Sequence, residues 1–233
     1  MQLCVSIGEP CANRVRAALS RISFAEIRLD LIEDIDIAAV KKLFTGKRTL
    51  IATCRAGKYS EAERLALLGA AIAAGAKYID LDYDGDLYRN KLFLPLMAVA
   101  RKAKCGLIVS RHFNEKMPTD KQLFDTVKKL AAFDPTYIKV AARADSEEAA
   151  ARLLALLALD KRVVPVTMGE WGPAGRIAAL SLGAPFTYVS PTGGRKTAPG
   201  QLDLATAKKL LGTHPQPLRA SSLRQGAKKR KTP

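Results

Sequence analysis

Short apolar runs rich in β-branched residues alternate along most of the chain with longer stretches rich in alanine and leucine. The short runs have the length of buried strands, and the longer stretches have the length and spacing of helices. Strands are predicted over 3–7, 25–29, 50–55, 78–82, 107–111, 137–140, 163–168 and 186–189. Helices are predicted over 13–20, 37–43, 60–74, 87–103, 120–132, 146–157, 175–182 and 203–211.

Start and stop signals support several of these helices. Ser60, Thr119 and Ser146 stand directly before acidic residues, as capping residues do before a first helical turn. Gly75 and Gly183 stand where two of the helices are expected to end. No two-residue hairpin turn joins a pair of predicted strands, so the connections should be helical and the sheet parallel.

The number of repeated β/α units predicts a (β/α)₈ TIM barrel, which needs roughly 200–250 residues. An open doubly wound sheet is the alternative. Its dinucleotide-binding form requires a G-x-G-x-x-G turn after the first strand, and Gly8-Glu9-Pro10 does not have that pattern. The barrel is therefore the predicted fold, as a single catalytic domain over 1–213.

Composition excludes several classes of protein. Hydrophobic residues make up 48% of the chain and charged residues 26%, as in an ordinary globular protein. The cysteines form no C-x-x-C pair and the two histidines are isolated, which predicts reduced thiols in the cytoplasm and no metal site. The start of the chain lacks a secretion signal, and no apolar run is long enough to span a membrane.

The net charge of +16 is concentrated in part at the end of the chain. Residues 217–233 contain six basic residues and no acidic one. The composition of 214–233 predicts a basic, disordered tail. Nucleic-acid binding is the alternative for such a charge, but no basic patch is interleaved with aromatic residues, and we do not expect this partner.

Polar residues within the predicted strands are the informative positions, because barrel strands are apolar on both faces. Most of them share one face and lie near the carboxyl end of a strand, where barrel active sites form. They are Glu26, Arg28, Arg55, Asp80, Asp82, His112 and Lys139. Taken singly, Glu26 and Arg28 could form an ordinary ion pair, and the two aspartates could cap a turn.

Lys139 lies within the apolar run TYIKVAA, where a lysine is rarely buried without a reason. Burial, with Arg28 and Arg55 nearby, is expected to lower its pKa and give a neutral, nucleophilic amine. Together with a histidine that moves protons, His112, this pattern predicts imine chemistry on an anionic carbonyl substrate. The residues alone leave that substrate open.

The same residues lie in motifs that resemble the type I 3-dehydroquinate dehydratase family. The motifs follow in order as E-I-R-L-D at 26–30, T-C-R at 53–55, I-D-L-D at 79–82, S-R-H at 110–112, Y-I-K-V-A at 137–141, M-G-E-W-G-P-A-G-R at 168–176 and K-T-A-P-G-Q at 196–201. The resemblance covers nearly all of 1–213. The chain departs from the family pattern at Asp82, where the family has Glu, at Phe113, and at Gly175, where the family has Ser.

The resemblance implies a cytoplasmic, homodimeric lyase without metal or other cofactor that dehydrates 3-dehydroquinate to 3-dehydroshikimate. It further implies that Lys139 forms the imine, that His112 moves the protons and that Asp82 orients His112. Substrate contacts are implied for Glu26, Arg28, Arg55, Arg176, Thr197 and Gln201, with Arg176 and Gln201 on the carboxylate and Thr197 in a closing loop. A class I aldolase acting on a phosphosugar is the alternative, with 193–196 as its phosphate site.

Overall fold

The computed structural model describes residues 2–83 and 91–213. Parallel strands alternate with helices, as the sequence pattern predicts. The strands are β1 (Leu3–Ile7), β2 (Phe24–Arg28), β3 (Thr49–Thr53), β4 (Tyr78–Asp82), β5 (Gly106–Phe113), β6 (Tyr137–Arg143), β7 (Val163–Met168) and β8 (Thr187–Val189). Three of the predicted strands, at 3–7, 78–82 and 163–168, have the predicted bounds, and the others differ at their ends.

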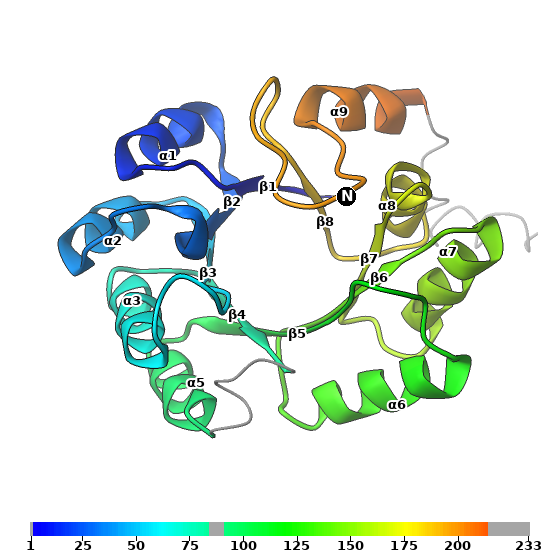
Figure 1. The fold of residues 1–233 in the computed structure, drawn as a ribbon, viewed down its shortest axis with the longest axis horizontal. Helices are drawn as coiled ribbons and strands as arrows, with labels where there is room; N and C mark the ends of the chain where they lie inside the picture. The colour runs from blue at the N-terminus through cyan, green and yellow to red at the C-terminus, as the bar shows by residue number, and fades with distance from the viewer. Residues whose placement is uncertain (1, 84–90, 214–233) are drawn as a thin grey trace, which may run out of the picture.

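The helices pack around the outside of the strands (Figure 1). They are α1 (Ala12–Ala18), α2 (Ile37–Phe44), α3 (Glu61–Ala73), α5 (Phe93–Lys102), α6 (Asp120–Ala131), α7 (Glu147–Leu154), α8 (Gly172–Ser181) and α9 (Leu204–Thr213). Ser60, Thr119 and Ser146 cap α3, α6 and α7 by accepting backbone N–H bonds, which confirms the predicted starts. Of the helix predicted over 87–103, residues 87–90 lie outside the described residues, Lys91 and Leu92 form a turn, and the helix itself begins at Phe93.

The strands follow one another around the sheet in the order β7-β6-β5-β4-β3-β2-β1-β8. Consecutive strands are therefore neighbours, which excludes the doubly wound alternative and confirms the (β/α)₈ barrel. In the described strands β7 and β8 approach each other without a hydrogen-bonded ladder, so the barrel is nearly closed. This gap between β7 and β8 is called the seam below.

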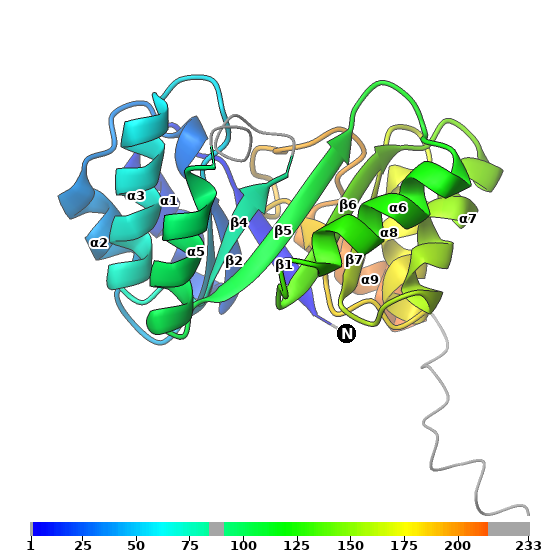
Figure 2. The same ribbon diagram turned by 90° about the horizontal axis from the view of Figure 1, so that it is seen from below.

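The barrel interior changes character along its axis. At the amino ends of the strands it is filled by aromatic rings from Phe24, Tyr78, Tyr137 and Phe186, with centroids 5.2–5.5 Å apart in contacting pairs. At the carboxyl ends, Glu26, Asp80 and Lys139 occupy inward positions instead. Because the lower half is packed with aromatic rings, the polar side chains collect toward the carboxyl ends of the strands. Figure 2 shows these ends at the upper edge of the ribbon.

The described fold extends to Thr213, so the division into a domain over 1–213 and a tail over 214–233 stays a prediction, and the tail lies outside the described residues. Among the helices of the described ranges, none is long and apolar enough to cross a membrane.

Candidate active site

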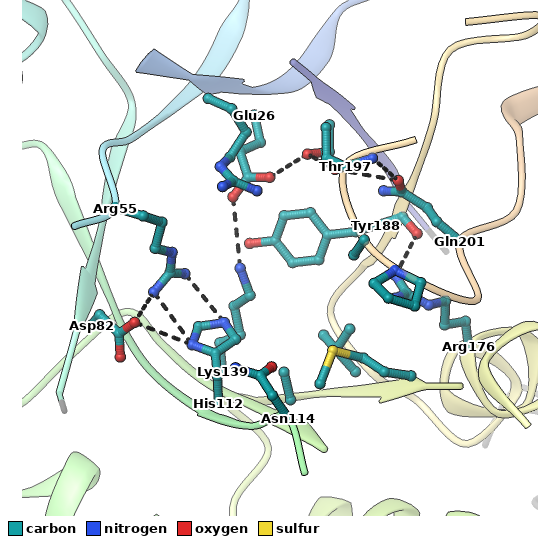
Figure 3. Close-up of a pocket in the computed structure, with 17 residues that line it drawn as sticks. Glu26, Arg55, Asp82, His112, Asn114, Lys139, Arg176, Tyr188, Thr197 and Gln201 are labelled. Atoms are coloured by element: carbon teal, nitrogen blue, oxygen red, sulfur yellow. Dashed lines mark hydrogen bonds and ion pairs between the residues drawn. The ribbon is translucent and has the colours of Figure 1, made fainter. Parts of the chain in front are cut away.

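A cavity of about 270 Å³ opens at the carboxyl ends of the strands. All of the site residues expected from the sequence line it: Glu26, Arg28, Arg55, Asp82, His112, Lys139, Arg176, Thr197 and Gln201. Figure 3 shows all of these side chains except that of Arg28 with labels, and they converge from the strands, from α8 and from the loop after β8. The structure thus brings the expected residues together, while the role of each residue stays a prediction.

Lys139 lies on β6 with its side chain in the barrel interior, and the residue is 6% exposed. Its Nζ donates to Oδ2 of Asp80 at 2.8 Å and lies 3.6 Å from Oε1 of Glu26. The ring centroid of Tyr188 lies 4.2 Å from Nζ. A buried ammonium is stable when carboxylates pair with it, so these contacts explain how an apolar strand holds a lysine.

Glu26 is buried on β2 and is held by hydroxyl groups as well as by Lys139. Ser6 Oγ donates to Oε2 at 2.5 Å, and Thr53 Oγ1 donates to Oε1 at 2.9 Å. Burial acts to raise the pKa of Glu26, but the positive charges of Lys139 and Arg28 outweigh burial and lower that pKa. Glu26 is therefore a carboxylate that can accept hydrogen bonds but has no proton to donate.

Arg55, just after β3, bridges two carboxylates of β4. Its Nη2 lies 3.1 Å from Oδ2 of Asp80, and its Nη1 contacts Oδ2 of Asp82. Burial acts to raise the pKa of Asp80, but Arg55 and Lys139 outweigh it and hold the pKa well below its usual range. In the same way burial opposes ionisation of Asp82, yet a hydrogen bond from His112 and the charge of Arg55 lower the Asp82 pKa to about 2.

His112, near the end of β5, lies against this charged group. Its Nδ1 is 3.4 Å from Oδ2 of Asp82, and its two ring nitrogens are 3.3 and 3.2 Å from the guanidinium nitrogens of Arg55. Burial and the positive charge of Arg55 lower the pKa of His112, against the opposing effect of Asp82. The imidazole is consequently neutral at pH 7 and can accept a proton.

Arg28 and Arg55 line the same cavity as Lys139, as expected, but neither is its direct partner. Arg28 is bound by Asp30, with its Nε at 3.0 Å and its Nη2 at 2.6 Å from the two carboxylate oxygens. Arg55 is bound by the β4 carboxylates, and carboxylates contact Lys139. The sequence showed which residues share the barrel face but not which charges pair, because several pairings have the same parity.

Arg176 projects from α8 into the seam between β7 and β8 and is 1% exposed. Its Nε donates to the carbonyl of Thr167 on β7 at 3.1 Å, and its Nη1 donates to the carbonyl of Tyr188 on β8 at 3.0 Å. Its Nη2 is buried without a partner. Burial lowers the pKa of Arg176 to about 10, so the guanidinium is still charged at neutral pH.

Gly175 explains how Arg176 reaches this position. A Cβ on Gly175 would lie 2.4 Å from Oγ1 of Thr167, closer than real Cβ contacts allow. The absence of a side chain lets the helix approach β7 closely. The departure from the family serine at this position is thus matched to Thr167.

The loop after β8 covers one side of the cavity. The backbone N–H of Thr197 donates to Oε1 of Gln201 at 2.9 Å, and Thr197 Oγ1 donates to Ser6 Oγ at 2.7 Å. Ser6 donates in turn to Glu26, so a chain of hydrogen bonds connects the loop with the carboxylate beside Lys139. Gln201 is 2% exposed.

Sequence reasoning missed several polar residues of the site. Ser6, Thr53, Ser110 and Tyr188 were not singled out, and Asp80 was noted without a role. Ser110 Oγ donates to Oδ1 of Asp80 at 2.5 Å. Strand parity could have found them, because each lies on the inward face near a strand end. Among the described residues, no group of three or more His, Cys, Asp or Glu could hold a metal ion.

Comparisons with known proteins agree with this geometry. A family model described as type I 3-dehydroquinase matches residues 3–216. The 3-dehydroquinate dehydratase of Thermococcus gammatolerans is 30% identical over 216 residues, covering 88% of this chain and 96% of that protein. The enzyme of the same name from Methanococcus maripaludis is 31% identical over 212 residues, covering 85% of this chain and 91% of that protein.

Solved structures support the fold. The 3-dehydroquinate dehydratase of Geobacillus kaustophilus superposes with a TM-score of 0.78 at 21% identity, covering 97% of this chain and 92% of that chain. The enzyme of Aquifex aeolicus gives 0.77 at 21% identity, covering 92% of this chain and 99% of that chain. With the family match over nearly the whole barrel, the chain belongs to the type I 3-dehydroquinase family, whose members are lyases.

Proposed function

We propose that this chain dehydrates 3-dehydroquinate to 3-dehydroshikimate through an imine on Lys139, with His112 as the acid and base. The observation that carries the proposal is a buried lysine and a neutral histidine in one cavity with a buried guanidinium whose Nη2 has no partner. A cyclic keto acid has both groups that such a cavity would recognise. The family supports the overall reaction, and the steps below rest on the geometry.

Arg176 would bind the substrate carboxylate. No acidic side chain among residues 2–83 and 91–213 forms an ion pair with Arg176. A buried charge without a counter-ion is unfavourable, so an arriving carboxylate gains a charge-assisted hydrogen bond to Nη2. Gln201, next to Thr197 in the covering loop, offers an amide N–H₂ to the same carboxylate.

Lys139 would attack the ring ketone after losing a proton. Its nitrogen then bonds to the ketone carbon, and the oxygen leaves as water when the imine forms. The imine draws electrons from the neighbouring carbon, so the C–H bond there becomes acidic. Asp80 and Glu26 are ionised beside the nitrogen and stabilise the positive charge of the protonated imine.

His112 would take the proton from that carbon, because its imidazole is neutral and borders the cavity. The electron pair moves toward the imine and then expels the ring hydroxyl, which leaves as water with the proton carried by His112. Hydrolysis of the imine releases the product and restores Lys139. Asp82 and Arg55 fix the ring plane of His112 during these transfers, while Glu26 and Arg28 lie where they would contact ring hydroxyls.

The test is reduction with borohydride in the presence of 3-dehydroquinate, followed by peptide mass mapping. The adduct should fall on the peptide that contains Lys139, and it should be absent from Lys139→Ala, which should have no activity. Lys121 on α6, paired with Asp125 at the surface, gives the matched control, and Lys121→Ala should behave as the parent protein. An adduct on another lysine, or activity in Lys139→Ala, would contradict the mechanism.

The aldolase alternative is not favoured. Its proposed phosphate site at 193–196 contributes no residue to the lining of the cavity that holds Lys139, whereas Thr197 does. We further propose a homodimer, from the family resemblance, and a cytoplasmic location, from the unpaired cysteines. Light scattering coupled to gel filtration tests its stoichiometry, and a monomer at all concentrations would exclude it.

A further inference from the structure

Tyr188 carries a buried hydroxyl group with no hydrogen-bond partner. The residue lies on β8, is 3% exposed and lines the cavity. Figure 3 shows its hydroxyl pointing toward the Lys139 nitrogen and the Glu26 carboxylate. A buried hydroxyl without a hydrogen-bond partner is unfavourable. We therefore expect the Tyr188 hydroxyl to donate a hydrogen bond to a group of the bound substrate.

The other hydroxyl groups of the site have their protons engaged. Ser6 and Thr53 donate to Glu26, Ser110 donates to Asp80, and Thr197 donates to Ser6. The carboxylates beside Lys139 are ionised and have no proton to give. Among the hydroxyl side chains that line the described cavity, Tyr188 therefore has the uncommitted proton.

The position of that proton fits the oxygen of the reacting ketone. To react, a ketone carbon must come within about 3–3.5 Å of the lysine nitrogen. The Lys139 nitrogen lies over the Tyr188 ring, 4.2 Å from its centroid, and Figure 3 shows the hydroxyl end of the ring on the side of the cavity where Lys139 and Glu26 lie. The ketone oxygen is bonded to the attacked carbon, so it is brought toward the same hydroxyl.

We propose that Tyr188 is a catalytic residue that donates a hydrogen bond to the ketone oxygen while Lys139 adds to the carbonyl. The nitrogen lone pair forms the new N–C bond, and the π electrons of C=O move onto oxygen as negative charge. The Tyr188 hydroxyl stabilises that charge without giving up its proton. The oxygen then takes the proton that the nitrogen loses, and the resulting carbinolamine loses water to give the imine.

This role differs from acid catalysis by Tyr188. Burial, with the negative charges of Glu26 and Asp80, raises the pKa of Tyr188 well above its usual value. The phenol is therefore neutral throughout the working pH range and acts as a fixed dipole. Such preorganised donors stabilise developing charge without reorganising in the transition state.

The inference rests on the proposed imine mechanism. Its test therefore asks two separate questions: whether the imine forms on Lys139 at all, and how fast it forms. Parent protein, Tyr188→Phe and Thr187→Val are mixed with 3-dehydroquinate and reduced with borohydride after increasing delays. Thr187 is the matched control, because its hydroxyl is also buried without a partner but lies on the opposite face of the same strand. Mass spectrometry gives the adduct fraction at each delay.

Tyr188→Phe should form the adduct on Lys139 about 100-fold more slowly than the parent protein, the effect of losing one donor to a developing oxyanion. Thr187→Val should match the parent rate. Both variants should melt at or above the parent temperature, because each loses an unsatisfied buried hydroxyl. A parent-like rate in Tyr188→Phe overturns the role of Tyr188 while leaving the imine mechanism standing; no adduct in the parent protein overturns the mechanism itself.

Discussion

Two arginines on opposite sides of the cavity, Arg55 half-buried and Arg176 fully buried, have pKa values displaced in opposite directions. Burial acts to lower the pKa of both. For Arg55, Asp80 and Asp82 outweigh that effect and raise the pKa well above its ordinary value. For Arg176, which binds backbone carbonyls in the seam, burial prevails and the pKa falls to about 10. On the Arg55 side of the cavity, carboxylates of the protein balance the positive charge. On the Arg176 side, no carboxylate of the described residues does.

The difference indicates which side of the cavity is complete without substrate and which side lacks an anionic partner. Lys139, Arg55 and His112 are held in place by carboxylates, so their geometry does not depend on a bound molecule. Arg176 is positioned equally firmly, but by groups that carry no net charge. A buried cation held this way gains most from an anion that comes from outside. In the proposed mechanism the seam is therefore the anchor for the substrate carboxylate, and the β2–β6 side is the reacting centre.

Removal of His112 should have the largest effect among the following changes. The balanced side is the part of the cavity where carboxylates pair with Lys139, Arg55 and His112. His112→Ala removes the proposed acid and base from it, and such a loss typically lowers the rate by about 10²–10⁴-fold. The imine should still form on Lys139, because the lysine keeps its carboxylates. Steady-state kcat and borohydride labelling measure the two effects, with His214→Ala, the other histidine of the sequence, as control. Loss of labelling in His112→Ala would show that the two functions are not separate.

Replacing each of the two arginines in turn by glutamine tests the comparison directly. Arg176→Gln should lower kcat/KM, mainly through KM, by about 10- to 150-fold, the equivalent of about 1.5–3 kcal/mol for a charge-assisted hydrogen bond. The unfolding free energy of Arg176→Gln should change little, because two effects oppose each other. The variant loses hydrogen bonds to the carbonyls of Thr167 and Tyr188, but it also loses a buried charge without a counter-ion. Arg55→Gln should instead lower the unfolding free energy, since Asp80 and Asp82 lose their shared cation. Equal destabilisation in both variants would refute the difference between the two sides.

Much of the balanced side could be predicted from strand parity. Glu26, His112 and Lys139 follow from polar residues at inward positions near strand ends, because a parallel barrel brings those ends to one mouth. The pairing of charges could not be predicted. Lys139 could have faced cations or carboxylates at the same parity, and the choice depends on side-chain directions to within an ångström.

The motif at 168–176 predicted Arg176 through the family resemblance, but the position of its guanidinium in the seam could not be predicted. Arg176 lies in a helix, and only the missing ladder between β7 and β8 makes its guanidinium a bridge between strands. The closure of a barrel is a property of all strands together, and no local pattern near residue 176 indicates it. Strand parity could have placed Tyr188 on the inward face, but parity does not show that its hydroxyl lacks a hydrogen-bond partner.

Asp82 tests how well the balanced side orients its base. Asp82→Asn should lower kcat about tenfold, because a neutral amide replaces the charged partner of His112, an effect of about 1.5 kcal/mol. Asp82→Glu should equal or exceed the parent, since Oδ2 now lies 3.4 Å from Nδ1 and a longer side chain can close that distance. Steady-state kinetics at matched stability make the comparison. Full activity in Asp82→Asn would exclude an orienting role.

The pH dependence of kcat/KM tests the same pair, His112 and Asp82, and the expected effect is smaller. Burial and Arg55 lower the pKa of His112, so kcat/KM should hold its plateau below pH 6.5 and fall only when the imidazole becomes protonated. Asp82 acts in the opposite sense and favours the imidazolium. Asp82→Asn should therefore move the acid limb to lower pH, and Arg55→Gln should move it to higher pH. A limb that does not move in either variant would belong to a group other than His112.

Truncation after Thr213 should have the smallest effect. It removes the basic residues of 217–233, another set of positive charges without acidic partners in that stretch, but the composition predicts that these charges are solvated. Water and salt screen an exposed charge within about 10 Å, whereas the buried guanidinium of Arg176 has no such screening. The family match extends to residue 216, just past the cut, but every residue that lines the cavity precedes the cut. We expect kcat/KM to be nearly unchanged, and any nucleic-acid binding by the full chain to be weak, with a salt slope of up to about −0.9 per neutralised phosphate. A large fall in kcat/KM on truncation would mean that unbalanced charge in the tail, like that at the seam, acts on the substrate.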